Sequence, residues 1–125
     1  MKYEISYSEE KKVVIGKVDG YFDLSAVSEI AGKLAKLNAE TNCDKVLTDL
    51  RNAEITNSTM EICRMPKAIS EAGLPRMCMI ALLIREVKPD YRFLETVSMN
   101  HGQQVELFND MGAAIAWLNS DSVQE

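Results

Sequence analysis

The sequence has little of what metal centres and disulfide-stabilised folds require. Its 125 residues include one histidine, His101, and three cysteines that are too far apart in the chain to form a paired-ligand motif. Zinc sites need clustered cysteine and histidine ligands, so we expect neither a metal nor another cofactor. An odd number of cysteines in a chain without an export signal indicates reduced thiols.

Long apolar runs and an excess of positive charge are also missing. The longest apolar run, residues 77–84, is far shorter than the roughly 20 residues that cross a bilayer. The N-terminus has no apolar segment of the kind found in signal peptides, so we expect a cytoplasmic protein. The net charge of −5 argues against a broad nucleic-acid or anionic-membrane surface. We therefore expect no nucleic-acid partner and no stable insertion into a membrane.

What is present has the composition of one globular domain. Hydrophobic residues make up 46% of the chain and charged residues 26%, which excludes wholesale disorder. No linker, internal repeat or low-complexity stretch divides the sequence, so we expect a single domain over residues 1–125. A chain of this length buries roughly two-thirds of its unfolded surface and folds without a disulfide or metal.

Strand and helix patterns alternate along the chain. Residues 3–7 and 12–18 are predicted strands joined by a short charged turn, which indicates an antiparallel hairpin that ends at Gly20. The predicted order is β-β-α-β-α-β-α-β-α, an α/β fold with a five-stranded, mostly parallel or mixed sheet and packed helices. The other strands are expected at residues 45–50, 77–84 and 103–108, and helices are expected to begin at Asp23, Ser58, Pro89 and residues 109–110.

The second helix has a marked beginning and an irregular interior. The sequence S-x-x-E from Ser58 to Glu61 predicts a capping box, in which the serine hydroxyl accepts a backbone N–H and the glutamate reaches back to the serine. Pro66 lies inside this helix and removes one backbone hydrogen bond, so we expect a kink or a break there. Residues 51–57, between the third strand and this helix, are predicted to form a loop.

Two segments resemble STAS-like proteins, the fold family of anti-sigma-factor antagonists. In the antagonists a strand ends in Asp-Leu, and Asp-Ser-Ser-Gly begins eight residues beyond that Asp, at the next helix start. Here Asp49-Leu50 is followed at the same spacing by residues 57–60, Asn-Ser-Thr-Met. The C-terminal segment has a Gly, a short strand ending in Phe, an Asn/Asp cap, then Ala and Trp-Leu. It is similar to a bacterial, mostly uncharacterised branch described as STAS-like or Sec14-like.

The resemblance implies a regulatory module rather than an enzyme. The first Ser of the antagonist motif is a phosphorylation switch, which makes Ser58 the candidate phosphoacceptor and Thr59 the second choice. A phosphate there adds about −1.5 to −2 charges at the positive end of a helix dipole and repels an acidic partner surface. A helix cap alone is sufficient to explain Ser58 without any switch, and both roles remain open.

The loop at residues 51–57 and the first turn of the second helix are the predicted partner-facing surface. It includes Arg51 and Asn57, with Asp49 at the carboxyl end of the preceding strand, where α/β folds usually bind ligands. A lone carboxylate does not specify acid–base catalysis, and Asp49 is alternatively a hydrogen-bond acceptor for loop amides. We therefore expect no enzymatic activity, a protein partner, and a possible symmetric homodimer.

Methionines and cysteines gather between residues 60 and 79. Flexible, polarizable side chains suit an adaptable apolar pocket, for which Met60, Cys63 and Met65 are candidates, but they equally suit simple packing against the sheet. The alternative function is a small carrier or sensor of a hydrophobic ligand or lipid, held between the second and third helices and the sheet. A chain of this size has little room for a lipid-sized cavity of roughly 300–1,000 Å³.

Overall fold

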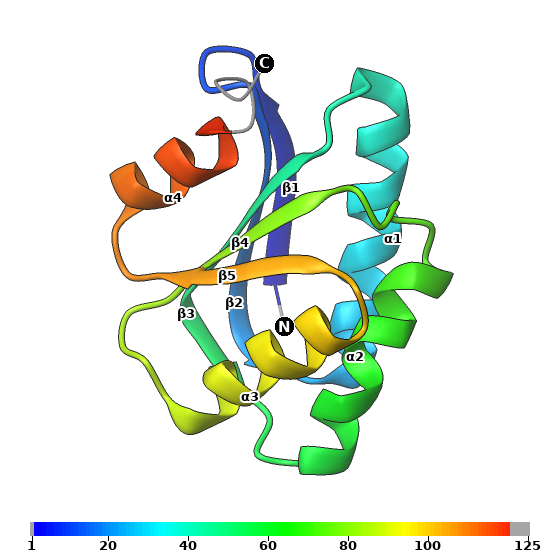
Figure 1. Ribbon diagram of the computed structural model, residues 1–125, viewed down its shortest axis with the longest axis vertical. Coiled ribbons are helices and arrows are strands. Elements are labelled where there is room, and N and C mark those ends of the chain that lie inside the picture. The colour runs from blue at the N-terminus through cyan, green and yellow to red at the C-terminus, as the bar shows by residue number, and fades with distance from the viewer. Residues whose placement is uncertain (1, 121–125) are drawn as a thin grey trace.

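A single five-stranded sheet with helices on both faces forms the computed structural model, which describes residues 2–120 (Figure 1). The strands are Lys2–Ser8 (β1), Val13–Phe22 (β2), Lys45–Ile55 (β3), Met79–Leu83 (β4) and Gln104–Phe108 (β5); the helices are Leu24–Thr41 (α1), Thr59–Glu71 (α2), Pro89–Asn100 (α3) and Met111–Leu118 (α4). The strand order is β1-β2-β3-β4-β5, with β1 and β2 antiparallel and all other neighbours parallel. The predicted α/β fold and order of elements are confirmed.

The two faces of the sheet are covered unequally. Successive strand residues point to opposite faces, so Val46 and Leu50 of β3 pack in the core under α1, α2 and α3, whereas Leu47 packs with Leu118 of α4. Figure 1 shows α4 on the opposite side of the sheet from α1 and α2. All five residues of β4 are buried, which explains why this strand is wholly apolar.

No helix within residues 2–120 is long and apolar enough to cross a membrane.

β3 is longer than its sequence pattern predicted. Residues 51–55 were expected in a loop, but they continue the strand because β2 also runs past Gly20 to Phe22 and pairs with them. The register shifts by one residue between Lys17 and Asp19 of β2, which marks a β-bulge in β3. The connection from β3 to α2 is therefore only three residues, 56–58.

α2 is one continuous helix. The predicted break at Pro66 is wrong, since the helix runs from Thr59 to Glu71 with Pro66 inside it. Pro66 is buried, and its carbonyl oxygen accepts a hydrogen bond from Nε2 of Gln103 at 2.7 Å. Packing of this buried face stabilises the helix, although Pro66 has no N–H to donate to the Ile62 carbonyl.

Candidate functional site

The carboxyl ends of β2 and β3 lie side by side and lead into the beginnings of α1 and α2. Phe22 and Ile55 are register neighbours, and the Phe22 carbonyl accepts a hydrogen bond from the Thr56 N–H at 3.0 Å. Asp23 then caps α1 through its Oδ1, and Ser58 caps α2 through its Oγ. Parallel pairing thus brings two helix N-termini together at the carboxyl ends of these strands, in the lower part of Figure 1.

Glu61 ties the two helix beginnings together. Ser58 behaves as a capping box predicts, because its Oγ accepts a hydrogen bond from the Glu61 N–H at 3.3 Å. The predicted reach of Glu61 back to Ser58 is wrong. Oε1 of Glu61 instead accepts a hydrogen bond from the Leu24 N–H of α1 at 3.0 Å. The carboxylate therefore lies at the positive ends of two helix dipoles, next to Ser58.

Thr56 organises the connection between β3 and α2. The residue is buried, and its Oγ1 accepts hydrogen bonds from the Tyr21 hydroxyl at 3.1 Å and from the Ser58 N–H at 3.2 Å. The segment that presents Ser58 is thereby anchored to β2. Ser58 is half-buried, whereas Asn57 and Thr59 are exposed. Both candidate phosphoacceptors lie at the first turn of α2, and their phosphorylation stays a prediction.

Asp49 has a structural role. It lies within β3 and is 5% exposed, and its carboxylate accepts three hydrogen bonds from Arg51, one from the backbone N–H and two from the guanidinium, at 2.9–3.1 Å. Burial favours the protonated acid, but the bonds and charge of Arg51, with Lys17 adding to them, outweigh burial and lower the pKa of Asp49. The prediction that Asp49 faces a partner is wrong, and its alternative role as a hydrogen-bond acceptor fits the geometry. Arg51 is exposed but lies in β3 and is held in this ion pair.

Three exposed apolar side chains belong to segments that meet near the start of α2: Met60 lies in its first turn, Tyr21 is bonded to Thr56, and Val87 precedes Lys88, which lines the groove there. Tyr21 is 49% exposed, Met60 64% and Val87 48%. A groove of about 260 Å³ runs beside them, lined by Tyr21, Glu54, Ile55, Asn57, Lys88 and Asp90. Apolar side chains within a polar rim are typical of protein-recognition surfaces. We call the region made of Tyr21, residues 56–60, Val87 and Lys88 the Ser58 surface.

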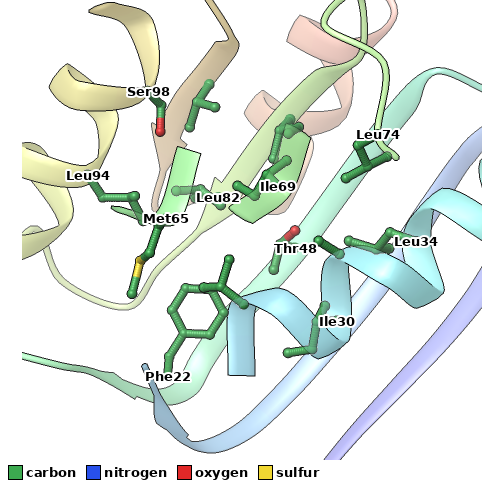
Figure 2. Close-up of a pocket in the computed structure, with 14 residues that line it drawn as sticks. Phe22, Ile30, Leu34, Thr48, Met65, Ile69, Leu74, Leu82, Leu94 and Ser98 are labelled. Carbon is green, nitrogen blue, oxygen red and sulfur yellow. The ribbon is translucent and has the colours of Figure 1, made fainter. Parts of the chain in front are cut away.

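An apolar cavity lies elsewhere, between α1, α2, α3 and the sheet (Figure 2). Met65 lines it, as predicted. Met60 and Cys63 do not, because both side chains are exposed on the opposite side of α2, so their assignment to the pocket is wrong. The volume is about 40 Å³, far below the roughly 300 Å³ at which pockets for drug-sized ligands begin. In this shape the cavity has no room for a lipid.

The thiols and acidic residues do not converge on a metal site. Within residues 2–120 no group of three or more histidine, cysteine, aspartate or glutamate side chains has a metal-binding arrangement. Burial, with the nearby Asp44 carboxylate and the Cys43 thiol, raises the pKa of Cys78 to about 11. Cys78 therefore stays a neutral thiol in the core at ordinary pH.

Sequence reasoning missed several residues of the Ser58 surface. Tyr21 follows Gly20, where the strand was expected to end, and its aromatic side chain next to a helix cap was the only local signal of an exposed anchor. No local pattern marks Val87. The contact of Glu61 with Leu24 joins residues 37 apart in the chain, so only the tertiary fold reveals it.

Among the comparisons with known proteins, only the comparison with solved structures gives matches. No protein-family model matches the chain, and no curated protein matches it. Ten chains among solved structures do match. One of them is the anti-sigma factor antagonist SpoIIAA in its unphosphorylated form, with a TM-score of 0.51, 17% sequence identity and coverage of 98% of both chains. The chain therefore has the STAS-like fold of that antagonist, as the sequence resemblance predicted.

Proposed function

We propose that the protein is a non-enzymatic regulatory module that binds another protein through the Ser58 surface. The observation that carries this proposal is the exposed Tyr21 in a groove with polar and charged side chains beside the start of α2, where Met60 is also exposed. An apolar centre with a polar rim is the usual composition of a protein–protein interface. The shared fold with SpoIIAA, an anti-sigma factor antagonist, supports a regulatory role of this kind.

In this proposal, phosphorylation of Ser58, or of Thr59 beside it, releases the partner. The Ser58 Oγ lies at the positive end of α2, where a phosphate is compatible with the helix. The same phosphate repels the carboxylate of Glu61, which is bonded to the Leu24 N–H. Phosphorylation therefore loosens the tie between α1 and α2 and places a double negative charge inside the apolar surface, and both effects disfavour the bound partner.

Binding is tested by quantitative capture from the cells that make the protein. Proteins bound to the wild type are compared with those bound to Tyr21→Ala and Met60→Glu. Met99→Glu is the matched control, because Met99 is 60% exposed but lies near the far end of α3, roughly 16 Å along the helix from Lys88. We expect a partner that both surface variants lose and the control keeps. A bound set that is the same for all four proteins contradicts the proposal.

The switch is tested separately by native mass spectrometry of the protein purified from its own cells. We expect a fraction of the chain to carry one phosphate, mapped by fragmentation to Ser58 or Thr59. If the chain carries no phosphate under any growth condition that changes partner binding, the phosphorylation switch is contradicted. The proposal that the Ser58 surface binds a partner is not affected by that result. The same spectrum reports whether the chain forms the homodimer that was expected from its small size.

A further inference from the structure

We propose that the cavity between α1, α2, α3 and the sheet binds a small uncharged molecule that carries one hydroxyl or carbonyl group. Its hydrogen-bonding partner is Ser98 of α3, which is 1% exposed and whose Oγ makes no hydrogen bond to any residue within 2–120. Figure 2 shows this oxygen pointing from α3 into the space beside Met65, Leu82 and Leu94. An unpaired buried hydroxyl is costly, so its position on a cavity wall indicates a partner from outside the chain.

The lining of the cavity determines the charge of the ligand. Twelve of the fourteen lining residues are apolar, and the other two, Thr48 and Ser98, carry neutral hydroxyls. An ion that enters this space loses its hydration, and the lining has no opposite charge to compensate for that loss. Carboxylates, phosphates and amines are therefore excluded. The ligand is neutral and mostly apolar, and this site is independent of the Ser58 surface.

The volume of the cavity determines the size of the ligand. The cavity volume of about 40 Å³ is about three times the roughly 10–15 Å³ that one water molecule needs, so a ligand of about three or four non-hydrogen atoms fits. Met65, with its flexible thioether side chain, forms part of the wall and permits a modest enlargement. Buried waters typically make about three hydrogen bonds, and the lining offers two side-chain hydroxyls. Short alcohols and ketones fit these limits better than water does.

The test uses 1-propanol as the probe and propionate as its charged counterpart with the same number of carbons. Methyl NMR spectra of the full chain follow Met65, Leu82 and Leu94 during each titration. We expect saturable shifts of these methyl groups with 1-propanol and none with propionate. Ser98→Ala keeps the space but removes the hydroxyl, so it weakens the affinity for 1-propanol about three- to tenfold.

A second variant fills the space instead of changing its polarity. Ala31 of α1 lines the cavity, and Ala31→Val is expected to abolish the saturable shifts while the methyl spectrum stays that of a folded protein. If that variant does not fold, Ser98→Ala still decides the question. Shifts that rise in proportion to the 1-propanol concentration, or an equal affinity in wild type and Ser98→Ala, overturn the proposal. A bound water that persists beside Leu94 at high 1-propanol concentration overturns it as well.

Discussion

At the scale of single residues, the buried polar side chains fall into two groups. The oxygens of Thr56 and Asp49 have partners: Thr56 fixes the backbone at the Ser58 surface, and Asp49 fixes Arg51 within β3. The hydroxyls of Ser98 and Tyr91 have none among the described residues. Burial, with the nearby Glu54 carboxylate, raises the pKa of Tyr91 to about 12, so this hydroxyl stays protonated at ordinary pH. The first group stabilises the fold, and the second lowers its stability.

Removing the unpaired hydroxyl of Ser98 tests this division. We expect Ser98→Ala to raise the free energy of unfolding by about 1 kcal/mol, because the variant no longer buries an unsatisfied group. Urea denaturation measures the change. Ser28→Ala, at an exposed position of α1, is the control for the better helix propensity of alanine and should give only a few tenths of a kcal/mol. A loss of stability in Ser98→Ala contradicts the assignment of an unpaired hydroxyl.

Asp49→Asn tests the ion pair with Arg51 through its pH dependence. The folded state lowers the pKa of Asp49, so the pair stabilises the protein fully above the unfolded-state pKa of about 3.9 and loses its contribution as the pH falls toward the folded-state pKa. We expect Asp49→Asn to cost about 1–2 kcal/mol at pH 7, since Arg51 is 43% exposed and partly screened. The difference from wild type should shrink when denaturation is measured at pH 3. A difference that is the same at both pH values contradicts the pKa shift.

At the scale of elements, α3 closes the outer edge of β5. β5 pairs only with β4, and its outward backbone groups alternate along the strand. The Leu107 N–H donates to Oε2 of Glu95 at 2.9 Å, and the Gln103 N–H donates to the Ser98 carbonyl at 3.0 Å. These two donors are therefore occupied and cannot pair with another strand. α3 therefore occupies part of the β5 edge of the sheet and disfavours pairing with another strand there.

Glu95→Ala is expected to reopen this edge. The variant frees the Leu107 N–H, so we expect concentration-dependent self-association in sedimentation velocity experiments. Arg92→Ala is the matched control, because it removes the 3.5 Å ion pair with Glu95 and leaves the contact with Leu107 in place. Identical sedimentation of Glu95→Ala and Arg92→Ala would show that Glu95 does not protect the edge.

The tie between α1 and α2 is a second contact between elements that a substitution can test. Glu61→Ala removes the acceptor of the Leu24 N–H, and we expect the free energy of unfolding to fall by about 1–2 kcal/mol. Glu71→Ala, at the exposed C-terminal end of the same helix, should leave stability unchanged or raise it slightly, because a carboxylate there opposes the helix dipole. If thermal denaturation shows that the two substitutions change the stability equally, the hydrogen bond between Glu61 and Leu24 does not stabilise the fold.

At the scale of the whole molecule, local patterns predicted the fold and the place of the Ser58 surface, but not all of the residues that form it. Hydrophobic periodicity and the caps Asp23 and Ser58 were enough for the order of elements, because these signals act within a few residues. The extension of β3 over residues 51–55 was missed because those residues are mostly polar and become a strand only by pairing with β2. The partner of Glu61 was missed for the same reason, since it belongs to a remote segment.

The most direct test of the proposed function is the amount of partner that Ser58→Glu retains, relative to wild type and Ser58→Ala, in a quantitative capture experiment. Ser58→Ala removes the cap, at a cost of about 1 kcal/mol, and keeps the surface uncharged. We expect Ser58→Ala to retain the partner and Ser58→Glu to retain at least about tenfold less, which corresponds to roughly 1.4 kcal/mol of binding free energy. Equal retention by all three proteins would contradict a partner surface centred on Ser58.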